Sequence, residues 1–259
     1  MKDDYAEFDA MAKWYDFDYE RRMRRDLPFY LDCAMEGGDP VLELGAGTGR
    51  VTAHLAKAGF RVTAVELSAA MLARAEQRRE RLGEARRRIR FLQGDMAELT
   101  VPGKFRTVIV PFRSFHHLYT VDRQLSALRG IRSRLTADGL AVFSLFRPDL
   151  EDLHANVGKM LVSYERKRPE TGTRVVQRFR ITCDFPAQMG FLDYYWDEYR
   201  GKRKIGRDHA PMRWRWFHRF EFQHLLARAG LRAVRLVGGY DGRPFDDRCE
   251  EMIFFAMRD

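Results

Sequence analysis

The stretch Val41-Leu42-Glu43-Leu44-Gly45-Ala46-Gly47-Thr48-Gly49-Arg50 decides the fold that this sequence predicts. A short, mostly apolar run, typical of a buried parallel strand, leads directly into three alternating glycines. Glycine lets the backbone adopt positive φ angles and approach a ligand closely. Residues 50–58 then have the pattern of an amphipathic helix, whose first N–H groups would point into the same crevice. The stretch therefore predicts a strand, a ligand-binding turn and a helix.

The spacing of the glycines separates two kinds of cofactor. A dinucleotide fingerprint has the form G-x-G-x-x-G, which would require a glycine at position 50. That position is Arg50, so a dinucleotide site is not predicted. The sequence carries instead an acid two residues before the first glycine, in the pattern Glu43-x-Gly45-x-Gly47-x-Gly49. This pattern resembles the first motif of the class I S-adenosylmethionine-dependent methyltransferases; a glycine-rich turn without a ligand is the alternative when the motif is taken alone.

A second acidic residue indicates that the ligand is a nucleoside. Residues 60–65 predict a strand that closes on Glu66, about twenty residues after Gly45. An acid at this place in a βαβ unit accepts hydrogen bonds from ribose hydroxyls. The run Glu66-Leu67-Ser68-x-x-Met71 also resembles the start of the next helix in the same methyltransferase family.

The resemblance implies a fold and a cofactor. The fold is a doubly wound α/β sheet of seven mostly parallel strands, and the cofactor is S-adenosylmethionine, released as S-adenosylhomocysteine. Residues 91–96 look like the end of the family's third strand, where Asp95 would contact the adenine amino group and the backbone of Met96 the ring. An exposed loop aspartate is the alternative for Asp95. The cofactor-binding residues that the resemblance implies are Tyr15, Glu43, Gly45, Ala46, Gly47, Glu66, Leu67, Met71, Asp95, Met96 and Pro111.

Residues 5–33 predict helix, with aromatic side chains at helical spacing that would pack over the carboxyl edge of the sheet. Within this segment, residues 14–19 resemble the Tyr-Asp signature of small-molecule methyltransferases, in which a tyrosine helps to cover cofactor and substrate. The resemblance assigns Tyr15 to both the catalytic and the cofactor site. An ordinary core aromatic is the alternative.

The fourth predicted strand, residues 106–110, ends in Pro111-Phe112-Arg113-Ser114-Phe115-His116-His117-Leu118. Ligands of doubly wound sheets lie outside the carboxyl ends of the strands, so this loop should face the cofactor. It lacks the (Asn/Asp/Ser)-Pro-Pro-(Tyr/Phe) run of methyltransferases that act on base amino groups, and the cysteine of those that attack pyrimidine carbon. It resembles the small-molecule branch with the "domain 25" type of methyltransferase domain and, more distantly, sugar amine N-methyltransferases.

That branch carries a histidine at the place of His117, with a shift of one residue to His116 as the alternative alignment. An unperturbed imidazole titrates near pH 6.5, so His117 suits the base that removes the proton of the methyl acceptor. The alternative is a histidine that caps the next helix or contacts the substrate without proton transfer.

The segment after the fifth predicted strand is rich in β-formers separated by Pro or Gly, which predicts an antiparallel insertion. We expect residues 1–150 to form a helical cap and the cofactor-binding core, 151–211 the insertion, and 212–259 the end of the core sheet, with 212–217 returning to that sheet. The insertion would be a lid and substrate platform, with a decorative or dimer-forming flap as the alternative. The candidate lining residues of the lid are Arg180, Tyr194, Tyr195 and Trp196.

Composition sets wider limits. A chain of 259 residues with 45% hydrophobic residues can bury the core of one large domain. Its three cysteines lie far apart without a C-x-x-C pair, so neither a disulfide framework nor a metal site is predicted. The sequence begins without an apolar signal core and has no run long enough to cross a bilayer, so we expect a cytoplasmic protein without a membrane partner.

The net charge of +9 would allow a polyanionic partner. The basic residues, however, are mostly arginines scattered among acids, which is typical of a solvated surface, and no nucleic-acid partner is expected. The predicted function is transfer of a methyl group to an oxygen or nitrogen of a small-molecule acceptor, by a chain that can form a homodimer through the insertion. The alternatives are an RNA methyltransferase, a binding module without turnover, and a non-methylating enzyme of this fold, such as one that cyclises the cofactor.

Overall fold

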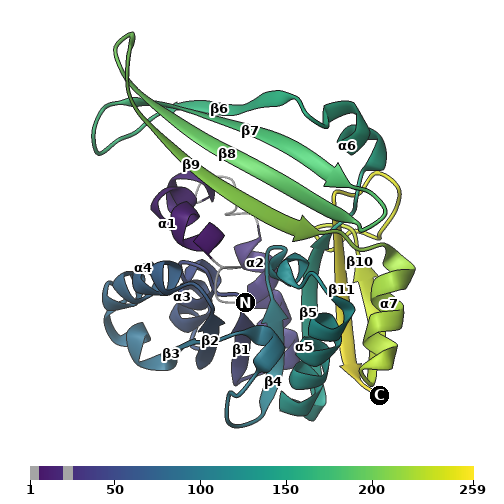
Figure 1. The fold of residues 1–259 in the computed structure, drawn as a ribbon. Helices are drawn as coiled ribbons and strands as arrows, with labels where there is room; N and C mark the ends of the chain where they lie inside the picture. The colour runs from purple at the N-terminus through teal and green to yellow at the C-terminus, as the bar shows by residue number, and fades with distance from the viewer. Residues whose placement is uncertain (1–5, 20–25) are drawn as a thin grey trace.

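The computed structural model describes residues 6–19 and 26–259. A seven-stranded sheet with helices on both faces lies beneath a four-stranded antiparallel sheet (Figure 1). The predicted doubly wound α/β fold with an antiparallel insertion is therefore confirmed. We call the four-stranded sheet the lid. None of the helices in the described ranges is long and apolar enough to cross a membrane.

The main sheet places its strands in the order β10-β11-β5-β4-β1-β2-β3. The five strands β3, β2, β1, β4 and β5 pair in parallel, whereas β11 pairs antiparallel with β5 and β10. The chain order reverses between β1 and β4, and this switch point is where ligands bind to such sheets. The bounds are β1 (Val41–Leu44), β2 (Val62–Glu66), β3 (Ile89–Gln93), β4 (Phe105–Val110), β5 (Leu135–Phe146), β10 (Leu231–Val237) and β11 (Glu251–Arg258).

Helices cover both faces of the main sheet because the inner strands are buried on both sides. One apolar cluster packs α5 and α7 on one face, and a second packs α2 and α3 on the other. The helical segments are α1 (Ala6–Tyr19), α2 (Leu27–Gly37), α3 (Arg50–Lys57), α4 (Ala69–Glu80), η1 (Gly83–Arg88), η2 (Met96–Glu98), η3 (Ser114–His117), α5 (Val121–Arg134), α6 (Leu150–Asn156) and α7 (Arg219–Arg228).

Arg50, which stands where a dinucleotide fingerprint would require glycine, has a structural role. Arg50 donates two hydrogen bonds of 2.6 Å to the carboxylate of Asp26, which is 1% exposed. This bidentate ion pair joins the start of α3 to the start of α2. Gly49, in the left-handed region at φ 74°, lets α3 pack closely: an added Cβ would lie 3.0 Å from Phe91 and 3.1 Å from Ala75.

The lid is a meander of four antiparallel strands: β6 (Met160–Lys167), β7 (Arg174–Asp184), β8 (Met189–Arg200) and β9 (Arg203–Arg215). Gly172, at φ 68°, and Gly201, at φ 59°, lie in two of its hairpin turns, as predicted. The prediction that residues 212–217 return to the main sheet is wrong. Residues 212–215 pair with β8 in the lid, so the expected boundary at 211 falls inside β9.

Helix α1 lies between the lid and the core (Figure 1). Trp14 stacks on Trp196 of β8, with ring centroids 5.8 Å apart, while Met11 belongs to the same apolar cluster as Met71 of α4. Of the helical segment expected over residues 5–33, α1 meets the lid and α2 packs against the main sheet, while residues 5 and 20–25 lie outside the described ranges.

Strand β5 also differs from its prediction. The run Ala-Asp-Gly at 137–139 has the sequence pattern of a tight turn, which predicts a strand that starts at residue 140, but β5 begins at Leu135 and these residues form a bulge within it. Phe105 of β4 pairs with Leu135 and Thr107 with Leu140, so the register shifts by several residues there. The sequence pattern of a turn and that of a bulge are alike, since both use small and polar residues.

Candidate active site

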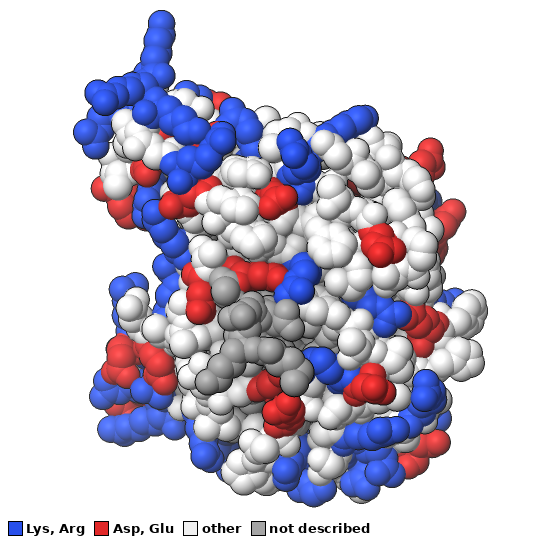
Figure 2. All heavy atoms as spheres, in the orientation of Figure 1, with Lys and Arg blue, Asp and Glu red and all other residues white. Residues whose placement is uncertain are grey.

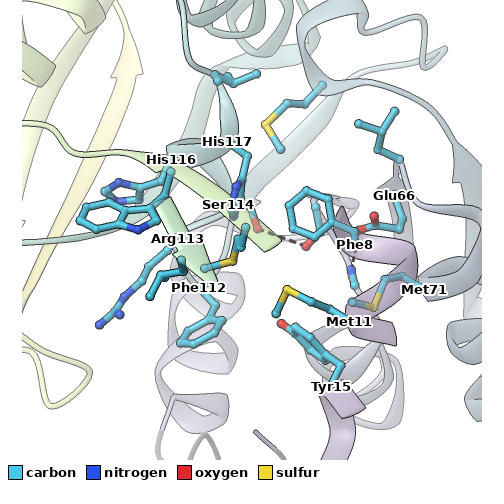
Figure 3. Close-up of a pocket in the computed structure, with 18 of the residues that line it drawn as sticks. Phe8, Met11, Tyr15, Glu66, Met71, Phe112, Arg113, Ser114, His116 and His117 are labelled. Carbon is cyan, nitrogen blue, oxygen red and sulfur yellow. Dashed lines mark hydrogen bonds between the residues drawn. The ribbon is translucent and has the colours of Figure 1, made fainter. Parts of the chain in front are cut away.

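A cavity of about 390 Å³ lies at the carboxyl ends of β1, β2 and β4, enclosed by α1 and the lid (Figure 3). Nine of the site residues expected from the sequence line it: Tyr15, Gly45, Gly47, Glu66, Leu67, Met71, Asp95, Met96 and His117. Three others, Glu43, Ala46 and Pro111, lie in the surrounding shell and do not line the cavity. The fold thus brings together segments from four parts of the chain.

The glycine turn is joined to β2 through Glu66. The Glu66 carboxylate accepts the N–H of Gly47 at 2.7 Å and the N–H of Ser68 at 2.9 Å, and the residue is 7% exposed. Burial raises the pKa of Glu66, while these two N–H donors oppose the shift. Each carboxylate oxygen still has a further acceptor lone pair, so the residue suits the hydroxyl donors of a ribose.

Gly45 and Gly47 leave room at the cavity wall. Both have positive φ, 79° and 57°. An added Cβ on Gly45 would lie 2.5 Å from the Ser114 hydroxyl, and one on Gly47 would lie 3.7 Å from the Tyr15 hydroxyl. The turn is therefore flanked by the β4 loop on one side and by α1 on the other, with a backbone surface between them that a nucleoside can approach.

Glu43 lies beneath this turn. It is fully buried, accepts a 2.5 Å hydrogen bond from Thr52, and its Oε1 has no hydrogen-bond partner among the described residues. Burial raises its pKa to about 7, against the Thr52 hydrogen bond and the Arg50 charge. Contact between Glu43 and the cofactor stays a prediction, because the residue stands behind the cavity wall.

Asp95 meets a partner that the sequence analysis missed. Its carboxylate pairs with Arg123 of α5 at 2.5 Å and accepts the N–H of Ala97 at 2.8 Å. Both Asp95 and Arg123 line the cavity. The Ala97 bond makes Asp95 the cap of η2, so its orientation is set locally, whereas the Arg123 contact joins residues 28 positions apart and has no local sequence signal.

The loop after β4 holds a strained turn. Phe112 and Arg113 have φ of 41° and 67°, and Ser114 N–H donates to Pro111 O at 3.1 Å. Two successive positive φ angles are typical of a type I′ turn, which normally takes Asn or Gly. Bulky residues in such a conformation cluster at functional sites. Both Phe112 and Arg113 line the cavity, and neither was expected as a site residue.

Three contacts hold this turn. The Tyr30 hydroxyl accepts the N–H of Phe112 at 3.0 Å, and Ser144 O accepts the N–H of Arg113 at 3.0 Å. The Arg113 guanidinium pairs with Glu251 at 2.9 Å. Residues of α2, β5 and β11 thus stabilise the strained turn together. Because these contacts come from distant segments, the local sequence carries no turn signal.

The two neighbouring histidines differ in their bonding. His116 uses both ring nitrogens: Nδ1 donates to Arg215 O at 2.6 Å and Nε2 accepts the N–H of Phe146 at 3.2 Å. Within the described part of the chain, His117 bonds only through Nδ1, which lies 2.9 Å from Arg213 O, and both histidines line the cavity. Burial lowers the pKa of both, that of His117 to about 4.

The wall contributed by α1 carries Phe8, Met11 and Tyr15, which point into the pocket (Figure 3). Burial raises the pKa of Tyr15 and keeps its hydroxyl protonated. Any role of Tyr15 in the reaction is therefore that of a hydrogen-bond donor or a cover over the glycine turn.

The lid supplies an apolar wall from Phe179, Ile181, Leu192, Tyr194, Met212 and Trp214. Of the lid residues expected from the sequence, only Tyr194 lines the cavity. Tyr195 points to the opposite face and stacks on His209, because side chains alternate along a strand. Trp196 stacks on Trp14 and does not line the cavity, and Arg180 is exposed.

Within residues 6–19 and 26–259, no group of three or more His, Cys, Asp or Glu side chains could hold a metal ion.

Residues 41–139, which span the strands, glycine turn and loop that form the floor of this cavity, match the family model described as a methyltransferase domain. The chain is a class I S-adenosylmethionine-dependent methyltransferase. Its methyl donor is S-adenosylmethionine, and the floor of the cavity fits a nucleoside through the bare turn at Gly47 and the carboxylate of Glu66.

Individual proteins that are similar to this chain are also methyltransferases. The cypemycin N-terminal methyltransferase of Streptomyces sp is 29% identical over 85% of this methyltransferase and 84% of its own length. In fold, the chain is similar to the CcbJ methyltransferase from Streptomyces caelestis, with a TM-score of 0.86 and 22% identity over 99% of both chains. It is also similar to CalS10, an amino pentose methyltransferase from Micromonospora echinaspora with bound S-adenosylmethionine, with a TM-score of 0.74 and 21% identity over 95% and 96% of the two chains.

Replacing Glu66 tests its predicted contact with the cofactor ribose. We expect Glu66→Ala to weaken binding of S-adenosylhomocysteine by about 1.5–3 kcal/mol, the range for a hydrogen bond to a charged group. Titration calorimetry measures the change, and NAD should give no heat. Glu80→Ala, on the exposed end of α4, is the matched control. Parental affinity in Glu66→Ala would show that the carboxylate does not bind the cofactor.

Replacing Glu43 tests the buried carboxyl beneath the turn. A folded pKa raised from 4.5 to about 7 stabilises the fold fully below pH 4.5, and this contribution is lost as pH rises through 7. The loss is on the order of 3 kcal/mol. Glu43→Gln, which cannot ionise, should therefore gain stability relative to the parent over this pH range and level off above it. Urea unfolding across the range measures the difference, and a difference independent of pH would contradict the raised pKa.

Proposed function

We propose that this methyltransferase methylates a nitrogen or oxygen of a small-molecule acceptor held between the β4 loop and the lid. The observation that carries the proposal is the ring of His117, which presents one unused nitrogen to an enclosed, mostly apolar cavity. The reaction needs a proton acceptor near the acceptor atom, and His117 has the chemistry for that role.

The tautomer of His117 follows from its partner. A carbonyl oxygen only accepts hydrogen bonds, so Nδ1 must carry the proton that it shares with Arg213 O. Nε2 then bears the lone pair. His116 cannot act in the same way, because its Nε2 already accepts the N–H of Phe146. This difference supports His117 over His116 as the base.

Burial keeps the His117 ring neutral at physiological pH, so Nε2 can accept a proton, but a pKa of about 4 makes it a weaker base than an unperturbed imidazole. The burial that disfavours the imidazolium disfavours an acceptor ammonium in the same cavity. An amine that enters would therefore lose its proton more readily than in water and would present a lone pair for methylation.

S-adenosylmethionine supplies a methyl group already activated on a sulfonium, so the main contribution of the protein is alignment and exclusion of water. The apolar side chains of Phe146, Leu192 and Trp214 line the side of the cavity next to the histidines. Phe8 and Met11 of α1 line it too. These walls favour an acceptor with an apolar or planar body.

The relatives favour nitrogen over oxygen. The cypemycin enzyme is named for methylation at an N-terminus, and CalS10 is an amino pentose methyltransferase. An N-terminus and an amino pentose each carry an amine. We therefore rank amines above phenols and carboxylates.

The net charge of +9 favours the alternative of an RNA substrate. On the face drawn in Figure 2, however, Lys and Arg are interspersed with Asp and Glu over much of the core, and basic side chains gather mainly at the upper left, where Figure 1 places the ends of the β6–β7 and β8–β9 hairpins. Charge alone bears on steering and non-specific binding, not on the reacting group. A homodimer through the lid stays a prediction.

A panel of acceptors tests the substrate class. We expect at least one small amine, phenol or carboxylate to release S-adenosylhomocysteine, with amines the most active, because the cavity accepts only small bodies. Mass spectrometry of the nucleoside product also detects methylthioadenosine, the mark of cofactor cyclisation. Total RNA and duplex DNA serve as comparison substrates. Stoichiometric methylation of RNA at physiological salt would overturn the proposal.

Replacing His117 tests the base. His117→Ala should lower turnover by about 10²–10⁴, the usual contribution of a positioned acid or base, while S-adenosylhomocysteine affinity changes little. Steady-state kinetics and calorimetry measure the two effects. His116→Ala is the neighbouring comparison, and it should act through stability instead, since both of its ring nitrogens hold backbone groups. A loss below tenfold in His117→Ala would reduce His117 to a structural or positioning role.

A further inference from the structure

One turn of α1 contacts both the cofactor side of the cavity and the histidine side. Three successive residues make these contacts: Glu7, Phe8 and Asp9. Each points to a different element. We call them the α1 clamp.

Asp9 holds the cofactor side. Its Oδ1 accepts the Ser68 hydroxyl at 2.5 Å and lies 3.4 Å from the N–H of Ala70. Ser68 is the N-cap of α4, and its own N–H donates to Glu66 at 2.9 Å. Ser68 therefore connects Asp9 to the carboxylate of Glu66, which suits the ribose.

Glu7 holds the lid. Its carboxylate accepts the backbone N–H of Arg213 at 2.9 Å and the Nε of the same residue at 2.6 Å. Glu7 is 7% exposed, so this double contact is shielded from water and is stronger than a surface ion pair. It fixes both the main chain and the side chain of Arg213.

The carbonyl of Arg213 is the group that orients His117. Arg213 O lies 2.9 Å from Nδ1 of His117 and also accepts the Tyr119 hydroxyl at 3.2 Å. Phe8 meets the histidine directly, with ring centroids 4.7 Å apart and planes at 88°. The edge contact and the carbonyl together restrict rotation of the imidazole. Phe8 also lines the cavity (Figure 3).

We propose that the α1 clamp is a positioning element that couples the cofactor-binding end of β2 and α4 to the orientation of His117. The inference rests on the proposed function, because it assigns a task to the residues that hold the base. When α1 is docked, Arg213 O holds the proton on Nδ1 and leaves Nε2 free toward the acceptor. When Glu7 is lost, the side chain of Arg213 is released and its carbonyl is held by the β8–β9 pairing without the bond to Glu7, so both ring orientations and tautomers become accessible. By reciprocity, a change at Asp9 that loosens α1 acts on His117 as well as on the cofactor.

The test compares Glu7→Gln, Phe8→Leu and Asp9→Asn with Lys13→Gln. Lys13 lies on the same helix and pairs with Asp208 of the lid, with its side chain 55% exposed, so it controls for a general loosening of α1. We expect Glu7→Gln and Phe8→Leu each to lower kcat by about 10–100-fold, since small misplacements of a reacting group have effects of this size. S-adenosylhomocysteine affinity should change less than about threefold in both. Asp9→Asn should weaken that affinity several-fold and lower kcat as well, whereas Lys13→Gln should leave both near the parent.

A second measurement separates positioning from stability. NMR of ¹⁵N-histidine protein reports the tautomer of each ring, and His117→Ala identifies the His117 signals among the seven histidines. The parent and Lys13→Gln should show the Nδ1–H tautomer. Glu7→Gln should show a mixture, with the His117 pKa falling further below 6.5, because the bond to the Arg213 carbonyl that raises it is weakened. The charged or titratable residues that contact His117 or lie beside it are His116 on its own element, Arg213 on β9 and Glu7 on α1, so each variant is also titrated for His116.

The outcomes are distinguishable. Retention of the pure Nδ1–H tautomer and of parental kcat in Glu7→Gln and Phe8→Leu, with normal folding by circular dichroism, would overturn the coupling. An effect of equal size in Lys13→Gln would overturn it too, because it would show that any loosening of α1 has the same effect as loss of the clamp residues. If His117→Ala keeps its turnover, the proposed function of the base fails, and the NMR signature still decides whether the clamp orients the ring.

Discussion

The carboxylate of Glu66 accepts one N–H from the glycine turn and one from the start of α4, and these two bonds join the parts of the site. Gly47 and Ser68 are separated by about twenty residues of helix and strand, yet they bond to the same side chain. The glycine turn therefore keeps its positive φ angles with the Gly47 N–H directed at an acid instead of at solvent. Because Ser68 also contacts Asp9, the position of α1 over the cavity depends on the same carboxylate.

Burial sets the chemistry of the charged groups around this carboxylate. The same apolar surroundings raise the pKa of Glu43 and Glu66 and lower that of His117, since each shift disfavours a charge in a medium of low polarity. The pairs Arg50–Asp26 and Arg123–Asp95 are each joined by short hydrogen bonds. The cavity is thus a region in which neutral forms of imidazole and amine are favoured, as methylation of a nitrogen requires.

The lid and α1 are distant in the sequence, and together they cover the cavity. Trp14 stacks on Trp196, and the Asp18 carboxylate accepts hydrogen bonds from Gln177 and Trp196 of the lid. Helix α1 and the lid therefore pack as one cover over the core. The residues of the lid that face the cavity come from β7, β8 and β9, and Tyr194 takes part whereas Tyr195 does not because successive side chains of a strand point to opposite faces.

The sequence by itself was sufficient to predict the part of the cavity that carries the glycine turn and Glu66. The run from Val41 to Arg50 and the acid at Glu66 are local patterns whose geometry follows from strand, turn and helix preferences, so their meeting at one sheet edge could be predicted. His117 could be proposed from its place after β4. Only the tertiary structure distinguished it from His116, because the difference lies in bonds to Arg213, Arg215 and Phe146 that the chain order does not reveal. The same holds for Arg123, the strained turn at Phe112 and the clamp at Glu7: each depends on contacts between distant segments, and such contacts leave no periodic or spacing signal in the sequence.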